Sequence, residues 1–263
     1  MSFSGLVMSD SFFSELVPNP SNKTVLREAH RGYSLVYPEN TLPAFEEAIN
    51  IGVDRIELDL RISSDGELVV IHDETVDRTT NLKGKVKNFK LAELKKLDAG
   101  EWKSTDFKGL QIPTLQEVFQ LAEGNCFVDI DLKDADAAQP MVKLAEKMNM
   151  VEQIVITGRI PECTSAIRKV NNSITMFYEF PNEIVKTRPA QAVKKIREFQ
   201  LPGCIINFQA ANSRFIRECK LHGLSILVWG VLNKEDMIKM INLGVDSIMT
   251  DDIALLNNVL IKN

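Results

Sequence analysis

Short apolar runs alternate with amphipathic segments of about ten residues along the chain from Val25 onwards. The runs are rich in β-branched residues, which favour strands over helices. We therefore predict eight strands, at Val25–Ala29, Arg55–Ile62, Cys126–Leu132, Gln153–Thr157, Thr175–Tyr178, Cys204–Asn207, Ser225–Trp229 and Ser247–Met249.

Between these runs, apolar residues recur at helical spacing. The predicted helices are Thr41–Ile51, Thr114–Glu123, Gln139–Met148, Pro161–Lys169, Gln191–Phe199, Ser213–Leu221, Lys234–Leu243 and Ile253–Ile261. Eight strands alternating with eight helices predict an α/β fold, a (β/α)₈ TIM barrel. The alternative is an open doubly wound sheet, but the chain has no GxGxxG or GxxxxGK[ST] motif of the kind such sheets use.

One connection is too long for a simple barrel. After the second strand, residues 73–113 form an insertion of about 40 residues with a single helical stretch, Leu91–Leu97. Long loops usually carry function, and this one would leave the barrel at the C-terminal face, where barrel active sites lie. We therefore divide the chain into an N-terminal extension, 1–20, and one barrel domain, 21–263.

The extension is either a short amphipathic helix packed on the barrel or a disordered arm. Phe12, Phe13, Leu16 and Val17 repeat at helical spacing, which favours the packed helix. It lacks the basic start of a secretory signal, and no apolar run approaches the roughly 18 residues that cross a bilayer. We expect a cytoplasmic protein without a transmembrane segment, and the oligomeric state stays open.

The composition of the chain narrows the classes of function that it can have. The net charge of −5 indicates no basic surface for nucleic acid, so we expect a small-molecule substrate. An acidic protein that binds an anion must supply positive charge locally, from Arg, Lys or a metal ion. The four cysteines form no CxxC pair, so we expect reduced thiols and neither a zinc site nor a disulfide framework.

Two strands carry carboxylates on one face. In Arg55–Ile62, Ile56, Leu58 and Leu60 share one face, while Glu57 and Asp59 share the other. The apolar face must meet the helices, so the carboxylates point into the barrel.

The third strand repeats this pattern with Asp129 and Asp131. Unpaired buried carboxylates cost several kcal/mol each, and a hard divalent cation, Mg²⁺ or Ca²⁺, relieves that cost. The alternative is a solvent-facing antiparallel strand, which the α/β rhythm disfavours.

Further polar residues stand at strand ends. His30 and His72 would reach the C-terminal mouth beside the carboxylates, where imidazoles suit proton transfer, whereas His222 ends a helix and is read as structural. Arg31 and Lys133 supply donors for a phosphate or pair with the acids. Trp229 either stacks on an organic headgroup or is a core aromatic.

These residues fall into an ordered set of motifs that resembles the glycerophosphodiester phosphodiesterase family between about residues 25 and 253. The matching motifs are His30-Arg31-Gly32, Pro38-Glu39-Asn40-Thr41, Glu57-Leu58-Asp59, Asp65-Gly66, Val70-Ile71-His72-Asp73, Asp77-Arg78-Thr79-Thr80, Leu97-Asp98-Ala99-Gly100, Ile112-Pro113-Thr114-Leu115, Asp131-Leu132-Lys133, Gly244-Val245-Asp246 and Thr250-Asp251. The resemblance implies metal-dependent hydrolysis of glycerophosphodiesters to glycerol 3-phosphate and an alcohol, with the substrate's own 2-hydroxyl as nucleophile.

The resemblance also assigns roles. It implies that His30 and His72 are the acid–base pair, that one divalent cation binds Glu57, Asp59 and a third-strand acid, and that Arg31 and Lys133 bind phosphate, with Arg31 also counted as catalytic. Glu39 and Asn40 would shape the mouth of the site. The third-strand acid is predicted to be Asp131, which stands where the family has Glu. Asp129, predicted to lie deeper in the barrel, is the other candidate for this metal ligand.

Two other functions stay open. The same residues serve a phospholipase D-type cleavage of lysophospholipids, given an apolar channel for an acyl chain. The non-enzymatic alternative is a barrel that binds phosphorylated ligands without turnover. The presence of both histidines and all three acidic positions argues against it, because a binding protein could lose either set.

Overall fold

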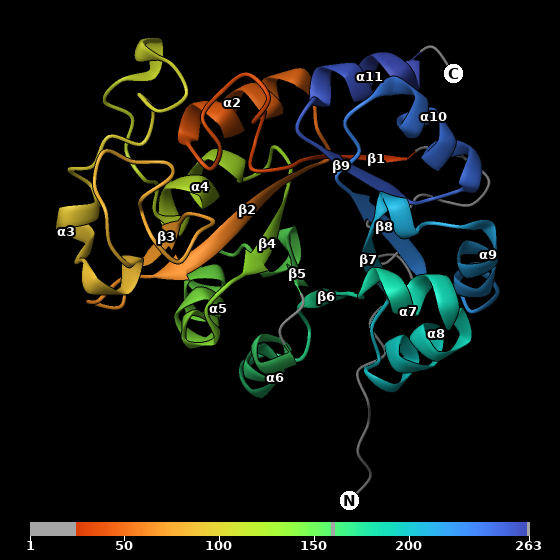
Figure 1. Cartoon of the computed structure of the whole chain (residues 1–263). Coiled ribbons are helices and arrows are strands. Elements are labelled where there is room, and N and C mark those ends of the chain that lie inside the picture. The colour runs from red at the N-terminus through yellow and green to blue at the C-terminus, as the bar shows by residue number, and fades with distance from the viewer. Residues whose placement is uncertain (1–24, 159–160, 262–263) are drawn as a thin grey trace, which may run out of the picture.

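Eight parallel strands close into a barrel, as predicted (Figure 1). The structure is a computed structural model that describes residues 25–158 and 161–261, so the predicted N-terminal helix lies outside the described residues. Pairing of the first strand with the second closes the ring. The barrel strands are β1 (Leu26–Ala29), β2 (Arg55–Ile62), β4 (Phe127–Leu132), β5 (Ile154–Gly158), β6 (Thr175–Glu179), β7 (Gly203–Asn207), β8 (Ser225–Trp229) and β9 (Ser247–Thr250).

Helices surround this barrel, and the last one lies against the first described elements of the chain. The last helix packs on both β1 and α2, which completes the outer layer where the barrel closes. The helices that follow the barrel strands are α2 (Leu42–Ile51), α4 (Leu115–Ala122), α5 (Ala138–Lys147), α6 (Pro161–Val170), α8 (Pro189–Glu198), α9 (Ser213–Leu221), α10 (Lys234–Leu243) and α11 (Ile253–Ile261). Each lies within two residues of its predicted bounds. A further helix, α7 (Asn182–Thr187), was not predicted because its six residues are too few to show a helical period.

The main core lies between the strands and the helices. Ile56, Leu58 and Leu60 of β2 are fully buried there with Phe45 of α2 and Phe119 of α4. The prediction that the apolar face of this strand meets the helices is therefore confirmed. The opposite face points into the barrel, where an apolar cluster from the later strands fills one side: Val155, Phe177, Ile205, Leu227 and Met249.

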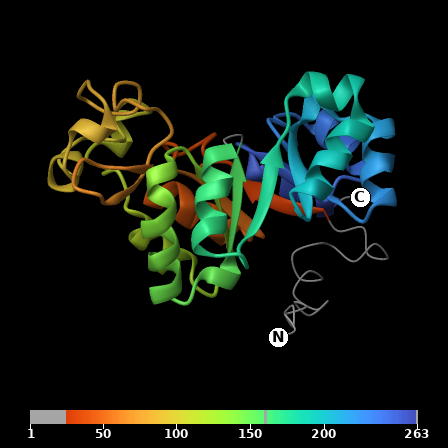
Figure 2. The ribbon, with the colours of Figure 1, turned by 90° about the horizontal axis from the view of Figure 1, so that it is seen from below.

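The segment between β2 and α4 forms a lobe at one side of the barrel (Figures 1 and 2). It opens with a strand that we did not predict, β3 (Leu68–Val70), which pairs antiparallel with the end of β2. At three residues the run is too short to be recognised from its pattern. The rest contains the 3₁₀ turns η1 (Val86–Asn88) and η2 (Thr105–Phe107) and one helix, α3 (Leu91–Leu94), which is shorter than predicted.

The lobe has its own small apolar cluster and rests on the loop between β1 and α2. Val76, Val86 and Leu94 are buried within it. The ammonium of Lys103 donates to the Ser34 carbonyl at 2.9 Å, and the Phe107 ring lies 5.5 Å from that of Tyr37. These contacts connect the lobe to the loop that carries Arg31.

Candidate active site

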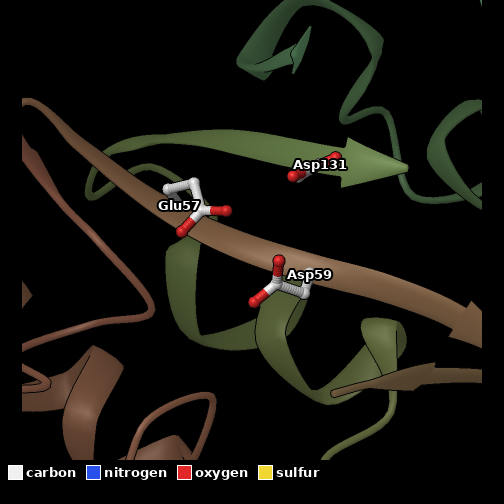
Figure 3. A group of neighbouring side chains, drawn as sticks. All are labelled: Glu57, Asp59 and Asp131. Carbon is white, nitrogen blue, oxygen red and sulfur yellow. The ribbon is translucent and has the colours of Figure 1, made fainter. Parts of the chain in front are cut away.

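Three carboxyl groups converge at the C-terminal end of the barrel. Glu57 and Asp59 project inward from β2, and the parallel register sets Asp131 of β4 beside Asp59. One ligand oxygen from each of the three lies within 4.8 Å of the other two (Figure 3). Glu57 and Asp59 are buried, so this is a concentrated negative charge with little access to water.

Two cations neutralise only part of this cluster. The Lys133 ammonium lies 2.9 Å from Asp59 Oδ1 and 2.5 Å from Asp131 Oδ2. The Arg31 Nε lies 3.1 Å from Asp59 Oδ2 as an ion pair, without the alignment of a hydrogen bond. Burial works against ionisation of Asp59, but the charges of Lys133 and Arg31 outweigh it and lower its pKa to about 2.

Glu57 is left without comparable compensation. Burial, together with the charge of Asp59, raises the pKa of Glu57 to about 8. Burial likewise raises the pKa of Asp131, against the effect of Lys133. A divalent cation would hold all three groups ionised, and carboxylate oxygens are the donors that Mg²⁺ and Ca²⁺ prefer. The cluster therefore fits a hard metal ion.

Asp129 lies away from this cluster, deeper in the barrel. It accepts a hydrogen bond from the Thr157 hydroxyl at 2.9 Å and lies 3.9 Å from Arg55, which in turn pairs with Glu28 at 3.3 Å. Burial, followed by the charge of Glu28, raises the pKa of Asp129 well above its usual range. Its surroundings are those of an interior polar plug, so the geometry favours Asp131 as the third-strand acid of the cluster.

Both predicted histidines face the same cavity, and each is held by a carboxylate. His30 Nδ1 lies 2.6 Å from Asp251 Oδ1, and His72 Nδ1 lies 2.6 Å from Asp73 Oδ1. Burial by itself lowers the pKa of His30, but the bond to Asp251 and the charge of Glu57 more than offset it, so the pKa is raised. A carboxylate on Nδ1 leaves Nε2 of each ring for a reacting group.

The motif residues Asp73 and Asp251 carried no role in the sequence analysis. The position of Asp73 next to His72 could have indicated that the two side chains interact. Asp251 lies 221 residues from His30, so no local pattern indicates their contact. His222, read as structural, caps the end of α9 and does not line the cavity.

The loop after β1 is built to hold Arg31 and the β2 carboxylates. The Arg31 amide donates to Glu57 at 2.9 Å, and the Asn40 side chain donates to Asp59 at 2.7 Å. Arg31 and Asn40 both have left-handed backbone torsions, with φ of 57° and 58°. Gly32 sits where a Cβ would lie 2.6 Å from the carbonyl carbon of Ala44, so only glycine fits this close approach of loop and helix.

Glu39 and Asn40 were predicted to shape the mouth for substrate. In the structure neither lines the main cavity: Asn40 is buried against Asp59, and Glu39 accepts a hydrogen bond from Arg31 at 2.8 Å. Both therefore position other site residues.

The cavity above the carboxylates has a volume of about 390 Å³ and two unlike walls. One wall carries the charged residues described above. The other is largely apolar and includes Trp229 at the end of β8, which also packs against the apolar cluster inside the barrel. Glu179 of β6 lines the cavity as well and was not predicted, because one acidic residue at a strand end gives no distinctive pattern. The lining residues are His30, Arg31, Glu57, Asp59, His72, Asp131, Lys133, Thr157, Gly158, Glu179, Ile205, Trp229 and Met249.

The closed barrel of eight parallel strands with helices outside is a TIM barrel, and its carboxylates and histidines lie at the C-terminal face, where TIM-barrel enzymes have their active sites. The profile of the Glycerophosphoryl diester phosphodiesterase family matches residues 30–255. The chain belongs to this family.

Known relatives cover most of the chain. It is 38% identical over 240 residues to the glycerophosphodiester phosphodiesterase of Caldanaerobacter subterraneus subsp. tengcongensis, covering 89% of this chain and 97% of the relative. The crystal structure of glycerophosphodiester phosphodiesterase from Agrobacterium tumefaciens has a TM-score of 0.81 at 29% identity, covering 89% of this chain and 100% of that one. A phosphodiesterase from Oleispira antarctica, solved in complex with the product sn-glycerol-3-phosphate, has the same fold, with a TM-score of 0.84 at 22% identity over 96% of this chain and 99% of that one.

Proposed function

We propose that this protein hydrolyses glycerophosphodiesters to glycerol 3-phosphate and an alcohol, with one divalent cation, Mg²⁺ or Ca²⁺. The observation that carries the proposal is the arrangement of two carboxylate-held histidines around the cluster of Glu57, Asp59 and Asp131 in one cavity. The three carboxylates would hold the cation. When bound, the cation supplies positive charge to the phosphodiester and lowers the pKa of an oxygen nucleophile.

The residues of the chain itself account for binding and proton transfer. Arg31 and Lys133 present cationic donors at the charged wall, where they contact the phosphate oxygens. The raised pKa of His30 suits it to hold a proton near neutral pH and to donate it from Nε2 to the leaving alcohol. His72, held by Asp73, accepts the proton of the nucleophile at its Nε2.

The nucleophile in this proposal is the glycerol 2-hydroxyl of the substrate, as the family resemblance implies. Its attack forms a cyclic phosphate, which water opens in a second step. A substrate in which hydrogen replaces the 2-hydroxyl tests this route, and turnover of that substrate at an unchanged rate would rule it out.

The apolar wall supports a role in binding the alcohol part of the substrate. Ile205, Trp229 and Met249 lie opposite the charged residues, so an organic headgroup packs against them while the phosphate meets Arg31 and Lys133. The same wall favours lysophospholipids as a second substrate class, because it offers an apolar surface to an acyl chain.

The test is release of glycerol 3-phosphate from glycerophosphocholine by wild type, His30→Ala and His222→Ala, each with and without EDTA. Loss of an acid–base residue typically costs 10²–10⁴-fold in rate, so we expect His30→Ala to fall about that far. His222→Ala, an exposed histidine outside the cavity, serves as the matched control and keeps wild-type activity.

Chelation should abolish activity in all three proteins, and adding back Mg²⁺ or Ca²⁺ should restore it in wild type and the control. Full activity of His30→Ala, or activity that resists EDTA, contradicts the mechanism. A wild type that is inactive with Mg²⁺, Ca²⁺ and Mn²⁺ contradicts the substrate class, and lysophosphatidylcholine is then the substrate to test.

A further inference from the structure

Arg78, in the lobe that follows β3, makes four hydrogen bonds to two carboxylates. Its Nε donates to Asp73 Oδ2 at 2.7 Å and its Nη2 to Asp73 Oδ1 at 3.2 Å. On the other side, Nη1 donates to Glu39 Oε2 at 2.7 Å and Nη2 to Glu39 Oε1 at 2.8 Å. A planar guanidinium that grips two carboxylates at once fixes the angle between them, which a lysine cannot do.

Each of these carboxylates also holds a residue of the cavity. Asp73 Oδ1 contacts His72 Nδ1, and Glu39 Oε1 accepts from Arg31 Nη1 at 2.8 Å. The result is an unbroken chain of contacts from Arg31 through Glu39, Arg78 and Asp73 to His72. Arg78 itself does not line the cavity.

The chain of contacts joins two segments that are far apart in sequence. Glu39 belongs to the loop between β1 and α2, whereas Asp73 and Arg78 follow β3. Arg78 thus belongs to the lobe and binds Glu39 of the β1 loop. Lys103 and Phe107 hold the same two segments together independently of it.

The energetics favour a role in orientation over one in folding. The Arg78 side chain is 42% exposed and that of Asp73 is 31% exposed. Water therefore solvates both charges when the pair is broken, and ion pairs this exposed add little to stability. Glu39, whose side chain is only 13% exposed, keeps Arg31 as its partner when Arg78 is lost. The hydrogen bond from Arg78 is the largest cause that lowers the pKa of Asp73 to about 2, which keeps this carboxylate ionised as the partner of His72.

We propose that Arg78 is a positioning residue that sets the orientation of His72 and Arg31 together, through Asp73 and Glu39. Its loss turns the imidazole and the guanidinium away from their places in the cavity without unfolding the barrel. The test by kcat/KM rests on the proposed function, whereas the test by nuclear magnetic resonance does not.

The test compares Arg78→Ala and Arg78→Lys with Arg27→Ala as a matched control. Arg27 grips one carboxylate, Asp54, through Nε at 2.9 Å and Nη2 at 3.1 Å, and it lies in β1 on the side away from the cavity mouth. Residues that orient a site residue through hydrogen bonds typically contribute about 10–100-fold to activity, so we expect kcat/KM to fall about that far in Arg78→Ala. Arg78→Lys should recover only part of the loss, and Arg27→Ala should keep kcat/KM.

Chemical rescue distinguishes the loss of an orienting guanidinium group from a general disturbance of the structure. Millimolar guanidinium ions should restore activity to Arg78→Ala, because the vacated position is open to solvent, whereas sodium chloride at the same concentration should not. A kcat/KM of Arg78→Ala within about twofold of the Arg27→Ala control overturns the proposal. So does a loss that guanidinium and sodium chloride restore equally.

The second readout is the Nδ1 proton of His72 in the nuclear magnetic resonance spectrum, assigned with His72→Gln. A proton in a 2.6 Å contact with Asp73 resonates far downfield, and we expect it to shift upfield or to vanish by exchange in Arg78→Ala but not in Arg27→Ala. An unchanged resonance overturns the inference. An inactive wild type would contradict the proposed function alone, since this spectrum still decides the role of Arg78.

Discussion

Glu57 and Asp59 stand two residues apart on one strand and point into the same cavity, yet they ionise very differently. The pKa of Asp59 is lowered to about 2 although burial opposes it, because Lys133 and Arg31 lie against it. The pKa of Glu57 is raised to about 8 by burial and by the charge of Asp59. Without a cation, Glu57 is therefore the group of this pair that holds a proton near neutral pH, and its ionised form is the one that a cation must stabilise.

Replacing Glu57 should stabilise the metal-free protein while damaging the site. A carboxyl whose pKa is raised on folding contributes stability below its unfolded pKa of 4.5, and that contribution is lost as pH rises towards about 8. We expect Glu57→Gln to raise the free energy of unfolding by roughly 1–3 kcal/mol at pH 7 and to leave it unchanged at pH 4. Urea unfolding in EDTA at the two pH values measures this.

Glu46→Gln is the matched control, because Glu46 is an exposed residue of α2 outside the cavity. Its substitution should change the free energy of unfolding by less than about 0.5 kcal/mol at either pH. A Glu57→Gln protein that is less stable than wild type at pH 7 in EDTA would show that Glu57 is ionised and well compensated without metal.

At the scale of elements, the start of α4 connects the lobe to the barrel. Thr114 and Glu117 form a capping box, with the Thr114 amide donating to Glu117 Oε2 at 2.7 Å. The same oxygen accepts from the Lys95 ammonium at 2.6 Å, just after α3. One carboxylate therefore caps a barrel helix and also anchors the lobe.

Substitution of Glu117 should cost stability through both contacts. Loss of a helix-capping interaction costs about 1 kcal/mol, and the partly exposed pair with Lys95 adds at most a few tenths, so we expect Glu117→Ala to lower the free energy of unfolding by about 1 kcal/mol. Denaturant unfolding is the measurement. Glu123→Ala, at the exposed end of the same helix, is the control and should cost far less. Equal losses in the two variants would show that the capping box adds nothing.

The two ends of the whole barrel are built differently. Towards the N-terminal end, Arg55, Glu28 and Asp129 form a buried plug whose charges lie against one another, with the Ser247 hydroxyl donating to Glu28 at 3.0 Å. At the C-terminal end, three carboxylates face two cations and an open cavity. Only the second group lines the cavity with oxygens from three carboxylates within 4.8 Å of one another, so among the described residues this is the end that suits a cation.

A divalent cation that binds the folded barrel should raise its melting temperature. At 100 times the dissociation constant, a ligand adds about 2.7 kcal/mol to the free energy of unfolding, which for a protein of this size amounts to several degrees. We expect Mg²⁺ or Ca²⁺ to raise Tm in wild type and EDTA to reverse the rise. Differential scanning calorimetry gives both values.

Asp131→Asn should lose most of this metal-dependent rise, whereas Asp106→Asn, an exposed acid of the lobe, should keep it. If Tm does not depend on either metal in wild type, the cluster of Glu57, Asp59 and Asp131 is not a cation site.

The described part of the chain contains no helix with the length and hydropathy of a membrane span. All four cysteines are buried free thiols. The barrel strands and most helices were predicted within two residues, because side-chain period follows directly from local backbone geometry. Short elements such as β3 and α7 carry too few residues to show a period, so they were missed.

Alternation along β2 and β4 is enough to predict which residues point into the barrel, since it separates Glu57, Asp59 and Asp131 from the apolar residues between them. How those groups are partnered depends on the folding of remote segments onto one another. Closure of the barrel brings Asp251 to His30, and docking of the lobe brings Arg78 to Glu39. Burial and contact between residues remote in the chain set the ionisation of each group, and no local pattern encodes them.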